Sequence, residues 1–417
     1  MVGLVDANNF YVSAERIFDL SLRNRPGAVL SNNDGCVVSR SDEFKALNLP
    51  RGIPFFKLKD LVRDKGVVVR SSNYELYGDI SRRILATLNE FSPDVEPYSI
   101  DEAFLHVSRP DVADFHAFGK AIRETVLRWV GVPCGVGFAP TRTLAKIANH
   151  IGKKLPDGVF VMPDNPAGVL EGVPVEEVWG IGRRVAPKLA ARGYRTAADL
   201  ALADVEWAKR QFSVTLARTI LELRGENAIA ADPPPDAAAG ISVSRSYGHP
   251  VTSLADIEES VAHYTARACE KLRRLERVAS GITVFLQHYM GVSAESGWGF
   301  RSAAVTFPSA TSSTSAMQNA LLPHVKGLFV PGFRYRKAGV LLFGLESAHL
   351  RQLELFDDHA ESARQERLSS AMDIINQRFG RGTLHALSEG VERQWSMRRE
   401  NLSPAYTTRW NDIPTVR

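Results

Sequence analysis

The stretch Tyr98-Ser99-Ile100-Asp101-Glu102-Ala103-Phe104-Leu105 places two adjacent carboxylates directly before an apolar run. That run continues to Val107 with only His106 interrupting it, a pattern typical of a buried β-strand. A second apolar run, Val2-Gly3-Leu4-Val5, ends at another carboxylate, Asp6. Ionised carboxylates at strand ends repel one another and lose hydration, so a metal ion or a partner charge usually holds them. Oxygen ligands of this kind suit magnesium.

The acidic pair needs a bend in the chain. Neighbouring side chains on an ideal strand point to opposite faces, so Asp101 and Glu102 can serve one site only if the strand bulges or turns there. We therefore expect the pair at the tip of a hairpin. The competing interpretation is an exposed turn that binds nothing, because Asp-Glu pairs are common in such turns.

The composition limits the class of protein. A chain of 417 residues predicts roughly two to four domains, and 44% apolar residues can form several cores. Its three cysteines lack metal-ligand spacing, which predicts free thiols in a reducing compartment. Asp6 interrupts the N-terminal apolar run, and Ala338 to Leu345 is too short to span a bilayer. We therefore expect a cytoplasmic protein without a membrane partner.

Positive charge is concentrated in one part of the chain. Residues 241–345 contain 11 lysines and arginines against 6 aspartates and glutamates, whereas residues 1–240 contain 30 of each class. A locally basic surface is expected where a protein binds a phosphate backbone, although ordinary solvated faces can also be basic.

Hydrophobic patterning divides the chain into segments. Strand and helix signals alternate up to residue 168, including a helix over Asp114 to Val130 that leads into a strand at Cys134 to Phe138. Short helical signals begin at Val173, and a run with three consecutive prolines within 231–240 indicates a linker. Beyond it, the predicted order is β-α-β-β-α-β. The expected strands are 241–247, 281–289, 301–307 and 334–345, and the expected helices are 256–277 and 316–325.

Several motifs, in this order, resemble the Y family of DNA polymerases and, more closely, its UmuC branch. They are Asp6-Ala7-Asn8-Asn9-Phe10-Tyr11, Asn32-Asn33-Asp34-Gly35-Cys36, Ser71-Ser72-Asn73-Tyr74-Glu75, the acidic pair, Gly135-Val136-Gly137-Phe138-Ala139, Thr143-Leu144-Ala145-Lys146-Ile147-Ala148, Trp179-Gly180-Ile181-Gly182-Arg183-Arg184 and Gln352-Leu353-Glu354-Leu355-Phe356-Asp357-Asp358. The likeness runs nearly end to end. It implies an error-prone, template-directed DNA polymerase that extends primers past damaged bases in the bacterial SOS response, associated with the nucleoid when active.

The resemblance also implies an α+β, multidomain right-hand polymerase. In this arrangement the ferredoxin-like palm comprises residues 1–25 and 74–168, the small fingers 26–73, the helical thumb with its helix-hairpin-helix 169–230, the linker 231–240, the β-α-β-β-α-β little finger 241–345 and a C-terminal tail 346–417.

By resemblance, Asp6, Asp101 and Glu102 are the catalytic carboxylates and hold two magnesium ions, with the backbone carbonyl of Ala7 as a further ligand. One ion would lower the pKa of the primer 3′-hydroxyl, and the other would hold the triphosphate.

The aromatic pair Phe10 and Tyr11 opens a predicted helix. Neighbouring helical side chains diverge by roughly 100°, so only one of the two can face the sugar of the incoming nucleotide. The resemblance selects Tyr11 as the gate against ribonucleotides, with Phe10 packed nearby. The alternative is that both are core aromatics.

The triphosphate site departs from the wider family. Aligning the family's Gly-x-Pro turn on Gly52-Ile53-Pro54 places Asp42 and Lys45 where the family has a Tyr and an Arg that grip the triphosphate. Lysine binds phosphate as a point charge, without the bidentate fork of arginine. We expect Arg40, Lys45 and Lys146 to bind the triphosphate.

Two further segments are expected to contact DNA. Gly180 and Gly182, followed by Arg183, resemble a helix-hairpin-helix loop in which glycines allow the backbone to approach a phosphate. The alternative is an ordinary tight turn. In the little finger, Arg334, Arg336 and Lys337 are the expected contacts to the DNA backbone.

The tail contains a motif for a protein partner. Gln352-Leu353-Glu354-Leu355-Phe356 matches the bacterial sliding-clamp peptide, in which Leu353, Leu355 and Phe356 would fill apolar pockets and Gln352 would fix the orientation. The alternative is a buried turn. The end of the tail, Trp395 to Arg417, interleaves aromatic residues and arginines, which predicts either partner binding or packing on the little finger.

The resemblance implies primer-template DNA, deoxynucleotides, a sliding clamp, a UmuD-like accessory dimer and a recombinase filament as partners. Two other functions agree with part of the sequence. A nucleotidyl cyclase on a similar palm explains the carboxylates but not the basic module, the Gly-Ile-Gly loop or the clamp-like peptide. A non-catalytic DNA-binding regulatory subunit conflicts with the complete acidic set.

Overall fold

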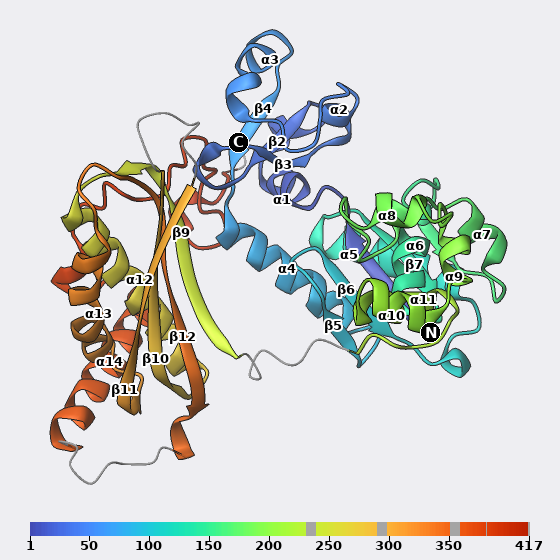
Figure 1. Ribbon diagram of the computed structural model, residues 1–417. Coiled ribbons are helices and arrows are strands. Elements are labelled where there is room, and N and C mark those ends of the chain that lie inside the picture. Colours follow the sequence, from blue (N-terminus) through green and yellow to red (C-terminus); the bar gives the residue numbers. More distant parts are fainter. Residues whose placement is uncertain (231–238, 290–297, 351–358, 381, 416–417) are drawn as a thin grey trace. The chain divides into compact units, whose positions relative to one another are not determined.

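The computed structural model describes residues 1–230, 239–289, 298–350, 359–380 and 382–415 (Figure 1). The chain divides into two compact units. The first unit contains residues 1–31, 35–232 and 401–417, and the second unit contains residues 32–34 and 233–400. Most of the predicted linker, residues 231–238, lies outside the described residues. Among the described helices, none has the length and apolar character that a bilayer crossing requires.

A five-stranded sheet forms the centre of the first unit. Its strands lie in the order β5 (Val95–Pro97), β6 (Glu102–His106), β1 (Val2–Ala7), β7 (Cys134–Ala139) and β8 (Val159–Val161). The central strand β1 pairs antiparallel with both β6 and β7, and β8 runs parallel to β7. The predicted strands are confirmed. Asp6 and Glu102 lie inside the strands rather than beyond their ends.

Helices cover both faces of this sheet. Because side chains alternate along a strand, the two faces of the sheet have separate buried clusters. Leu4 and Phe104 pack on one face with α6 (Arg142–Gly152). Val5 and Leu105 pack on the other with α4 (Tyr74–Leu88) and α5 (Phe115–Val130). The predicted helix before β7 is confirmed as α5. It begins where the Asp114 side chain accepts hydrogen bonds from backbone N–H groups and ends at Gly131 with φ +82°.

The helix α6 lies unusually close to the sheet. A Cβ atom at Gly137 in β7 would collide with backbone atoms of Ala145, Ala148 and Asn149. Only glycine therefore permits this approach. The Asn149 side-chain amide also donates hydrogen bonds to the carbonyls of Leu4, at 3.2 Å, and Gly135, at 2.8 Å. These contacts fix α6, and with it Lys146 and Lys153, relative to β1.

Two smaller parts complete the first unit. A three-stranded sheet in the order β3 (Val37–Arg40), β2 (Gly27–Leu30) and β4 (Val68–Ser71) has its own buried cluster with α2 (Asp42–Lys45) and α3 (Lys59–Asp64) nearby. Five short helices follow β8: α7 (Ala167–Glu171), α8 (Ala186–Ala190), α9 (Ala197–Ala201), α10 (Val205–Gln211) and α11 (Val214–Leu223). They share a core with α6. The helix α1 (Phe10–Phe18) follows β1 and packs on α4.

The second unit confirms the predicted β-α-β-β-α-β order. Its elements are β9 (Gly240–Val251), α12 (Leu254–Arg274), β10 (Arg277–Tyr289), β11 (Trp298–Thr311), α13 (Thr314–Leu328) and β12 (Arg334–Ser347). The antiparallel sheet has the order β11-β10-β12-β9. Figure 1 shows α12 and α13 on one face of this sheet. Val284, Leu286 and Val340 are buried on that face.

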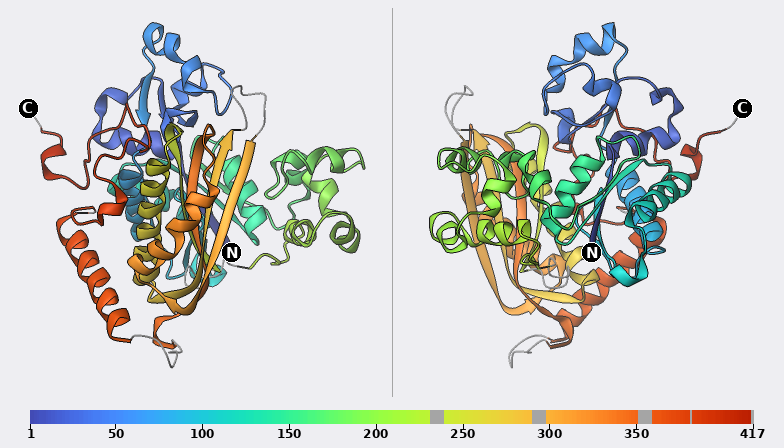
Figure 2. Two further views of the ribbon diagram at one scale, coloured as in Figure 1. Left: turned by 60° about the vertical axis from the view of Figure 1, so that its left-hand side comes forward. Right: turned by 90° about the vertical axis from the view of Figure 1, so that its right-hand side faces the viewer.

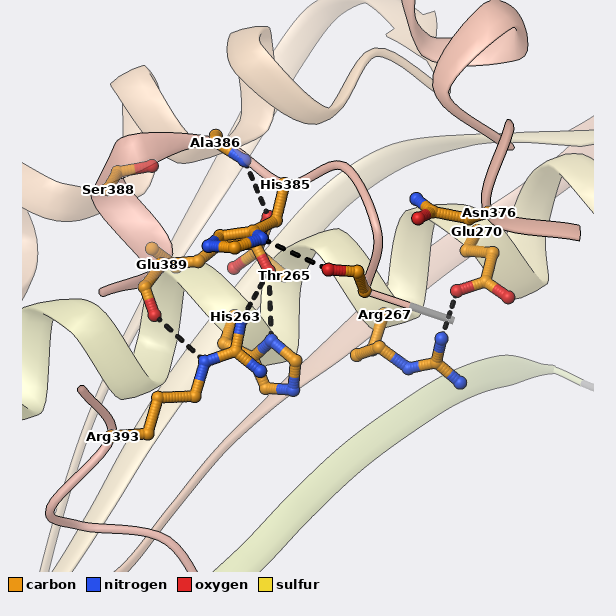
Figure 3. A network of polar contacts seen from close by, with 12 residues as sticks. His263, Thr265, Arg267, Glu270, Asn376, His385, Ala386, Ser388, Glu389 and Arg393 are labelled. Atoms are coloured by element: carbon orange, nitrogen blue, oxygen red, sulfur yellow. Dashed lines mark hydrogen bonds and ion pairs between the residues drawn. The ribbon is translucent and has the colours of Figure 1, made fainter. Parts of the chain in front are cut away.

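A helix that the sequence analysis did not foresee, α14 (His359–Phe379), packs on the helical side of the second unit (Figure 2). Its Asp373 forms a two-point contact with Arg273 of α12 at 2.6 and 2.8 Å. The chain then runs back across α12 (Figure 3). There the buried Glu389 accepts a hydrogen bond from the backbone N–H of Ala386 and lies 2.8 Å from Nδ1 of His263. Trp395 is buried in the same core.

The last part of the tail belongs to the first unit. Ser403 is only 4% exposed there, and the Tyr406 ring stacks on Phe18 of α1 with centroids 4.8 Å apart. The tail therefore contributes to both units. The segment around Trp395 packs on the predicted little finger, whereas the segment around Tyr406 packs on the first unit. Packing on the predicted palm was not among the alternatives that the sequence suggested.

Candidate active site

The hairpin between β5 and β6 brings the acidic pair to β1. Asp6 and Glu102 are direct partners in the antiparallel register, which places side chains on one face at Cβ separations of about 4.5–5.5 Å. The backbone N–H of Ala7 donates to the carbonyl of Asp101 at 2.9 Å. Asp101 lies in the hairpin connection, as predicted, and not in the strand.

Ser99 shapes this connection. Its hydroxyl donates to the Asp101 carboxylate at 2.6 Å and accepts a hydrogen bond from the backbone N–H of Glu102 at 3.1 Å. The backbone N–H of Ser99 also donates to the carbonyl of Glu102 at 3.0 Å, so the bend that adjacent side chains need to serve one site is a turn over residues 99–102.

Two lysines from α6 and its C-terminus hold two of the carboxylates. Lys153 Nζ lies 2.5 Å from Asp6, and Lys146 Nζ lies 2.9 Å from Glu102. Burial raises the pKa of Asp6 to about 6; Lys153 opposes the rise, and the charges of Glu102 and Asp101 add to it. Sequence reasoning missed Lys153, because nothing in the local pattern links the end of α6 to β1.

The chemistry of the donor atoms, rather than their spacing in this structure, suits a hard divalent cation such as Mg²⁺. The residues concerned offer only carboxylate oxygens and the Ala7 carbonyl, and burial, with a smaller contribution from Glu102 and Asp101, raises the pKa of Asp6. Among the described residues, no three His, Cys, Asp or Glu side chains converge closely enough to form a metal-binding group. A cation bound here would compete with Lys146 and Lys153 for the carboxylates.

The aromatic pair divides as the helix geometry predicts. Phe10 is 3% exposed and belongs to the core, whereas Tyr11 is half-buried. The Tyr11 ring stacks on Tyr77 of α4, with centroids 4.3 Å apart and an angle of 12° between the planes. Tyr74 packs edge-on against the Tyr11 ring at 6.3 Å.

A pocket of about 680 Å³ lies beside these residues within the first unit. Its lining includes the carboxylates Asp6, Asp101 and Glu102, the rings of Phe10 and Tyr11, and the basic side chains Arg40, Lys45, Arg51 and Lys153. The pocket therefore combines an acidic wall, an aromatic wall and a basic wall.

The basic wall differs in part from the predicted set. Arg40 donates to the carbonyl of Leu49 at 3.1 Å, and Lys45 pairs with Asp42 at 2.9 Å. Lys146 does not line the pocket, because it lies on Glu102 and over the Tyr98 ring, 4.3 Å from its centroid. Arg51 was missed; its position just before the Gly52-Ile53-Pro54 turn was the available signal.

The predicted helix-hairpin-helix loop is built from short elements. Gly180 has φ +85°, a conformation that favours glycine, while Gly182 has open space around it. Arg183 is exposed. A three-residue 3-10 turn (Val175–Glu177) precedes the loop, and the five-residue α8 follows it.

The predicted DNA contacts of the second unit lie at the start of β12. Lys337 pairs with Gln287, which pairs with Phe300, so the three share the sheet face opposite the helices. Arg334 is exposed, and Arg336 is half-buried. The predicted clamp peptide, including Gln352, Leu353, Leu355 and Phe356, lies outside the described residues.

Comparisons with known proteins cover the whole chain. Residues 5–150 match the impB/mucB/samB family, residues 238–355 match the C-terminal domain of that family, and residues 366–416 match a domain of unknown function. The chain is 42% identical to Protein UmuC and 38% identical to Protein ImpB, both of Salmonella typhimurium, and each alignment covers 100% of both chains. It is 30% identical to DNA polymerase IV of Pelotomaculum thermopropionicum over 90% of this chain and 92% of that protein.

Solved structures share the fold. A Y-family DNA polymerase chimera of Dbh and Dpo4 has a TM-score of 0.66 at 20% identity, covering 83% of this chain and 99% of that one. An insertion ternary complex of Dbh DNA polymerase has a TM-score of 0.56 at 19% identity, with the same coverage. These matches support the predicted α+β right-hand architecture.

Proposed function

Because this chain belongs to the UmuC branch of the Y-family DNA polymerases, we propose that it carries out translesion DNA synthesis in the SOS response, by a mechanism that uses two magnesium ions. The observation that supports this mechanism most directly is the pairing of Asp6 with Glu102 beside Asp101 at one end of the sheet.

The chain's own residues position and neutralise the reactants. Asp6, Asp101, Glu102 and the Ala7 carbonyl would hold the Mg²⁺ ions, which when bound activate the primer 3′-hydroxyl and offset charge on the leaving pyrophosphate. Lys146 and Lys153 each pair with one of these carboxylates, for which a bound ion would compete. Arg40, Lys45 and Arg51 line the pocket and would meet the triphosphate.

Tyr11 is the proposed sugar gate. Tyr11 and Phe10 both line the pocket that contains the carboxylates, but Tyr11 is half-buried, whereas Phe10 is only 3% exposed and packs in the core. A ribonucleotide would bring its 2′-hydroxyl against the Tyr11 ring, so the exclusion is steric.

Several partners belong to this proposal. Primer-template DNA would contact the Gly180 to Arg183 loop and the basic start of β12, including Arg334, Arg336 and Lys337. A sliding clamp would bind the peptide at 352–356, and a UmuD-like dimer and a recombinase filament would act as accessory factors. The working compartment is the cytoplasm, at the nucleoid.

Primer extension tests the proposal against both alternatives. The purified chain should add deoxynucleotides to a primer in the presence of Mg²⁺, on an undamaged template and across an abasic site. A nucleotidyl cyclase would leave the primer unchanged and release a cyclic nucleotide, while a non-catalytic DNA-binding subunit would do neither. Absence of extension on both templates, by a folded chain that binds them, would contradict the proposal.

A further inference from the structure

The Tyr11 ring depends on a neighbour from another helix. Tyr77 of α4 lies flat against it, 4.3 Å away, and is itself fully buried. Any shift of Tyr77 therefore changes the support of Tyr11. No other ring is stacked parallel to Tyr11 among the described residues, because its contacts with Phe10 and Tyr74 are tilted or edge-on.

Tyr77 is held in turn by a buried carboxylate. Its hydroxyl donates a hydrogen bond of 2.8 Å to Oε1 of Glu15, which lies on α1, the helix that also bears Tyr11. Burial, together with the nearby Glu15 carboxylate, raises the pKa of Tyr77, so the hydroxyl stays a donor. The other oxygen of Glu15, Oε2, is buried without a hydrogen-bond partner among the described residues.

The second hydroxyl on Glu15 comes from the end of the chain. Ser403 Oγ donates to the same Oε1 atom at 3.1 Å, and the two residues are 388 positions apart in sequence. Ser403 also accepts a hydrogen bond of 3.0 Å from the side-chain amide of Asn73. Asn73 is the N-cap of α4, since its side chain accepts from the backbone N–H of Leu76. The tail thus touches both helices that support the gate.

Contacts on either side of Ser403 secure the segment. Asn401 and Ser71 form two hydrogen bonds of 2.9 Å each, one to the Ser71 hydroxyl and one between backbones. The Tyr406 ring stacks on Phe18. Ser403 is therefore fixed opposite Glu15 by anchors both before and after it.

We propose that Ser403, Glu15 and Tyr77 form a positioning chain for the Tyr11 ring, through which the C-terminal segment 401–415 sets the discrimination against ribonucleotides. The inference rests on the proposed role of Tyr11 as the sugar gate. Steric exclusion is sensitive to small displacements, because a ring that moves away from the pocket leaves room for a hydroxyl. Ser403, Glu15 and Tyr77 act through Tyr11 and do not line the pocket themselves.

The test uses the full-length chain and compares kcat/KM for a deoxynucleotide with kcat/KM for the matching ribonucleotide. Tyr77→Phe should lower this ratio by about three- to tenfold, because the ring remains but its anchor is lost. Ser403→Ala should lower it in the same direction by less. Incorporation of the deoxynucleotide should change by less than about twofold in both, because neither residue lies in the pocket.

Two controls separate positioning from general weakening of the fold. Thr87→Ala removes a buried hydroxyl from the same helix and should leave the ratio unchanged, because within the described part of the chain this hydroxyl bonds only to the Arg83 carbonyl. Combining Tyr77→Phe or Ser403→Ala with Tyr11→Ala should lower the ratio no further than Tyr11→Ala alone. If Tyr77→Phe or Ser403→Ala does not fold, two variants of Glu15 replace them. Glu15→Gln keeps an oxygen that accepts hydrogen bonds and should keep the ratio. Glu15→Met has a similar size but lacks that acceptor and should lower the ratio.

The outcomes distinguish this inference from the proposed function. If Tyr11→Ala admits ribonucleotides but Tyr77→Phe and Ser403→Ala retain the wild-type ratio, the positioning chain is wrong and the gate stands. If Tyr11→Ala also retains the wild-type ratio, both are wrong. A further loss of discrimination in the Tyr11→Ala background would likewise overturn the positioning chain.

Discussion

The two large sheets of this polymerase present charge in different ways. On the first-unit sheet, Asp6 and Glu102 are partly buried and each contacts one lysine. On the open face of the second-unit sheet, Lys337 is separated by one strand from two exposed rings: Phe300 stacks on Phe285, and Trp298 packs on Tyr289. The first-unit sheet holds individual carboxylates in place, whereas the second-unit sheet presents a broad surface. Single substitutions should therefore have large effects on the first sheet and graded effects on the second.

The strongest test of this contrast is Asp101→Asn, which removes charge without changing volume. We expect nucleotide incorporation to fall by roughly a thousandfold or more, because a ligand that stabilises the transition state is lost. Single-turnover primer extension measures the effect. DNA affinity and the thermal unfolding midpoint should stay close to wild type, and normal turnover would remove Asp101 from the proposed metal site.

Next in size is the effect of Tyr11→Ala on sugar selection. The ratio of deoxyribonucleotide to ribonucleotide incorporation efficiencies should fall by about tenfold or more, because the excluding ring is gone. Phe10→Ala is the matched comparison, since Phe10 is adjacent but buried. A fall in the ratio for Phe10→Ala alone would show that the two roles are reversed.

A smaller, distributed effect is expected on the second-unit sheet. Reversing the charge of Arg334, Arg336 and Lys337 together should weaken DNA binding by about tenfold at low salt and flatten the dependence of affinity on salt, because fewer counterions are released. Binding titrations at several salt concentrations measure both. Trp298→Ala is the matched control on the same sheet and should leave the salt slope unchanged. Salt-independent binding by wild type would contradict the electrostatic interpretation.

The smallest effect on DNA synthesis without a clamp is expected for the predicted clamp peptide at residues 352–356. Changing Gln352, Leu355 and Phe356 together to Ala should leave extension of a short primed template unchanged, because no catalytic group is altered. Stimulation by a loaded sliding clamp should disappear. Equal loss of activity with and without the clamp would instead indicate a structural role for the peptide.

Most of the fold could be predicted from local patterns in the sequence. Alternation and turn signals predicted the strands that bear Asp6 and Glu102, the hairpin at Asp101 and the succession of strands and helices along the second unit, because each depends on residues close in sequence. The resemblance to a family supplied the role of the carboxylates and the choice of Tyr11 over Phe10.

Contacts between distant elements were not predictable in this way. Lys153 contacts Asp6 from the end of α6, which Gly137 allows to lie close to β7, and Lys146 contacts Glu102 and Tyr98 and does not line the pocket. Likewise, the sequence around Ser403 does not predict its contact with Glu15. Side-chain pairs of this kind depend on how helices and strands pack, and a single sequence does not specify that packing.

The route of the chain has a consequence for proteolysis. Apart from residues 32–34, the second unit runs from residue 233 to residue 400, after which the chain re-enters the first unit, where Ser403 and Tyr406 are packed. One backbone cut between residues 230 and 239 would therefore leave two fragments, and the smaller C-terminal fragment would still carry a piece of the first unit's fold. Such fragments should remain associated after cleavage, and co-expressed halves split at this point should reassemble into an active enzyme.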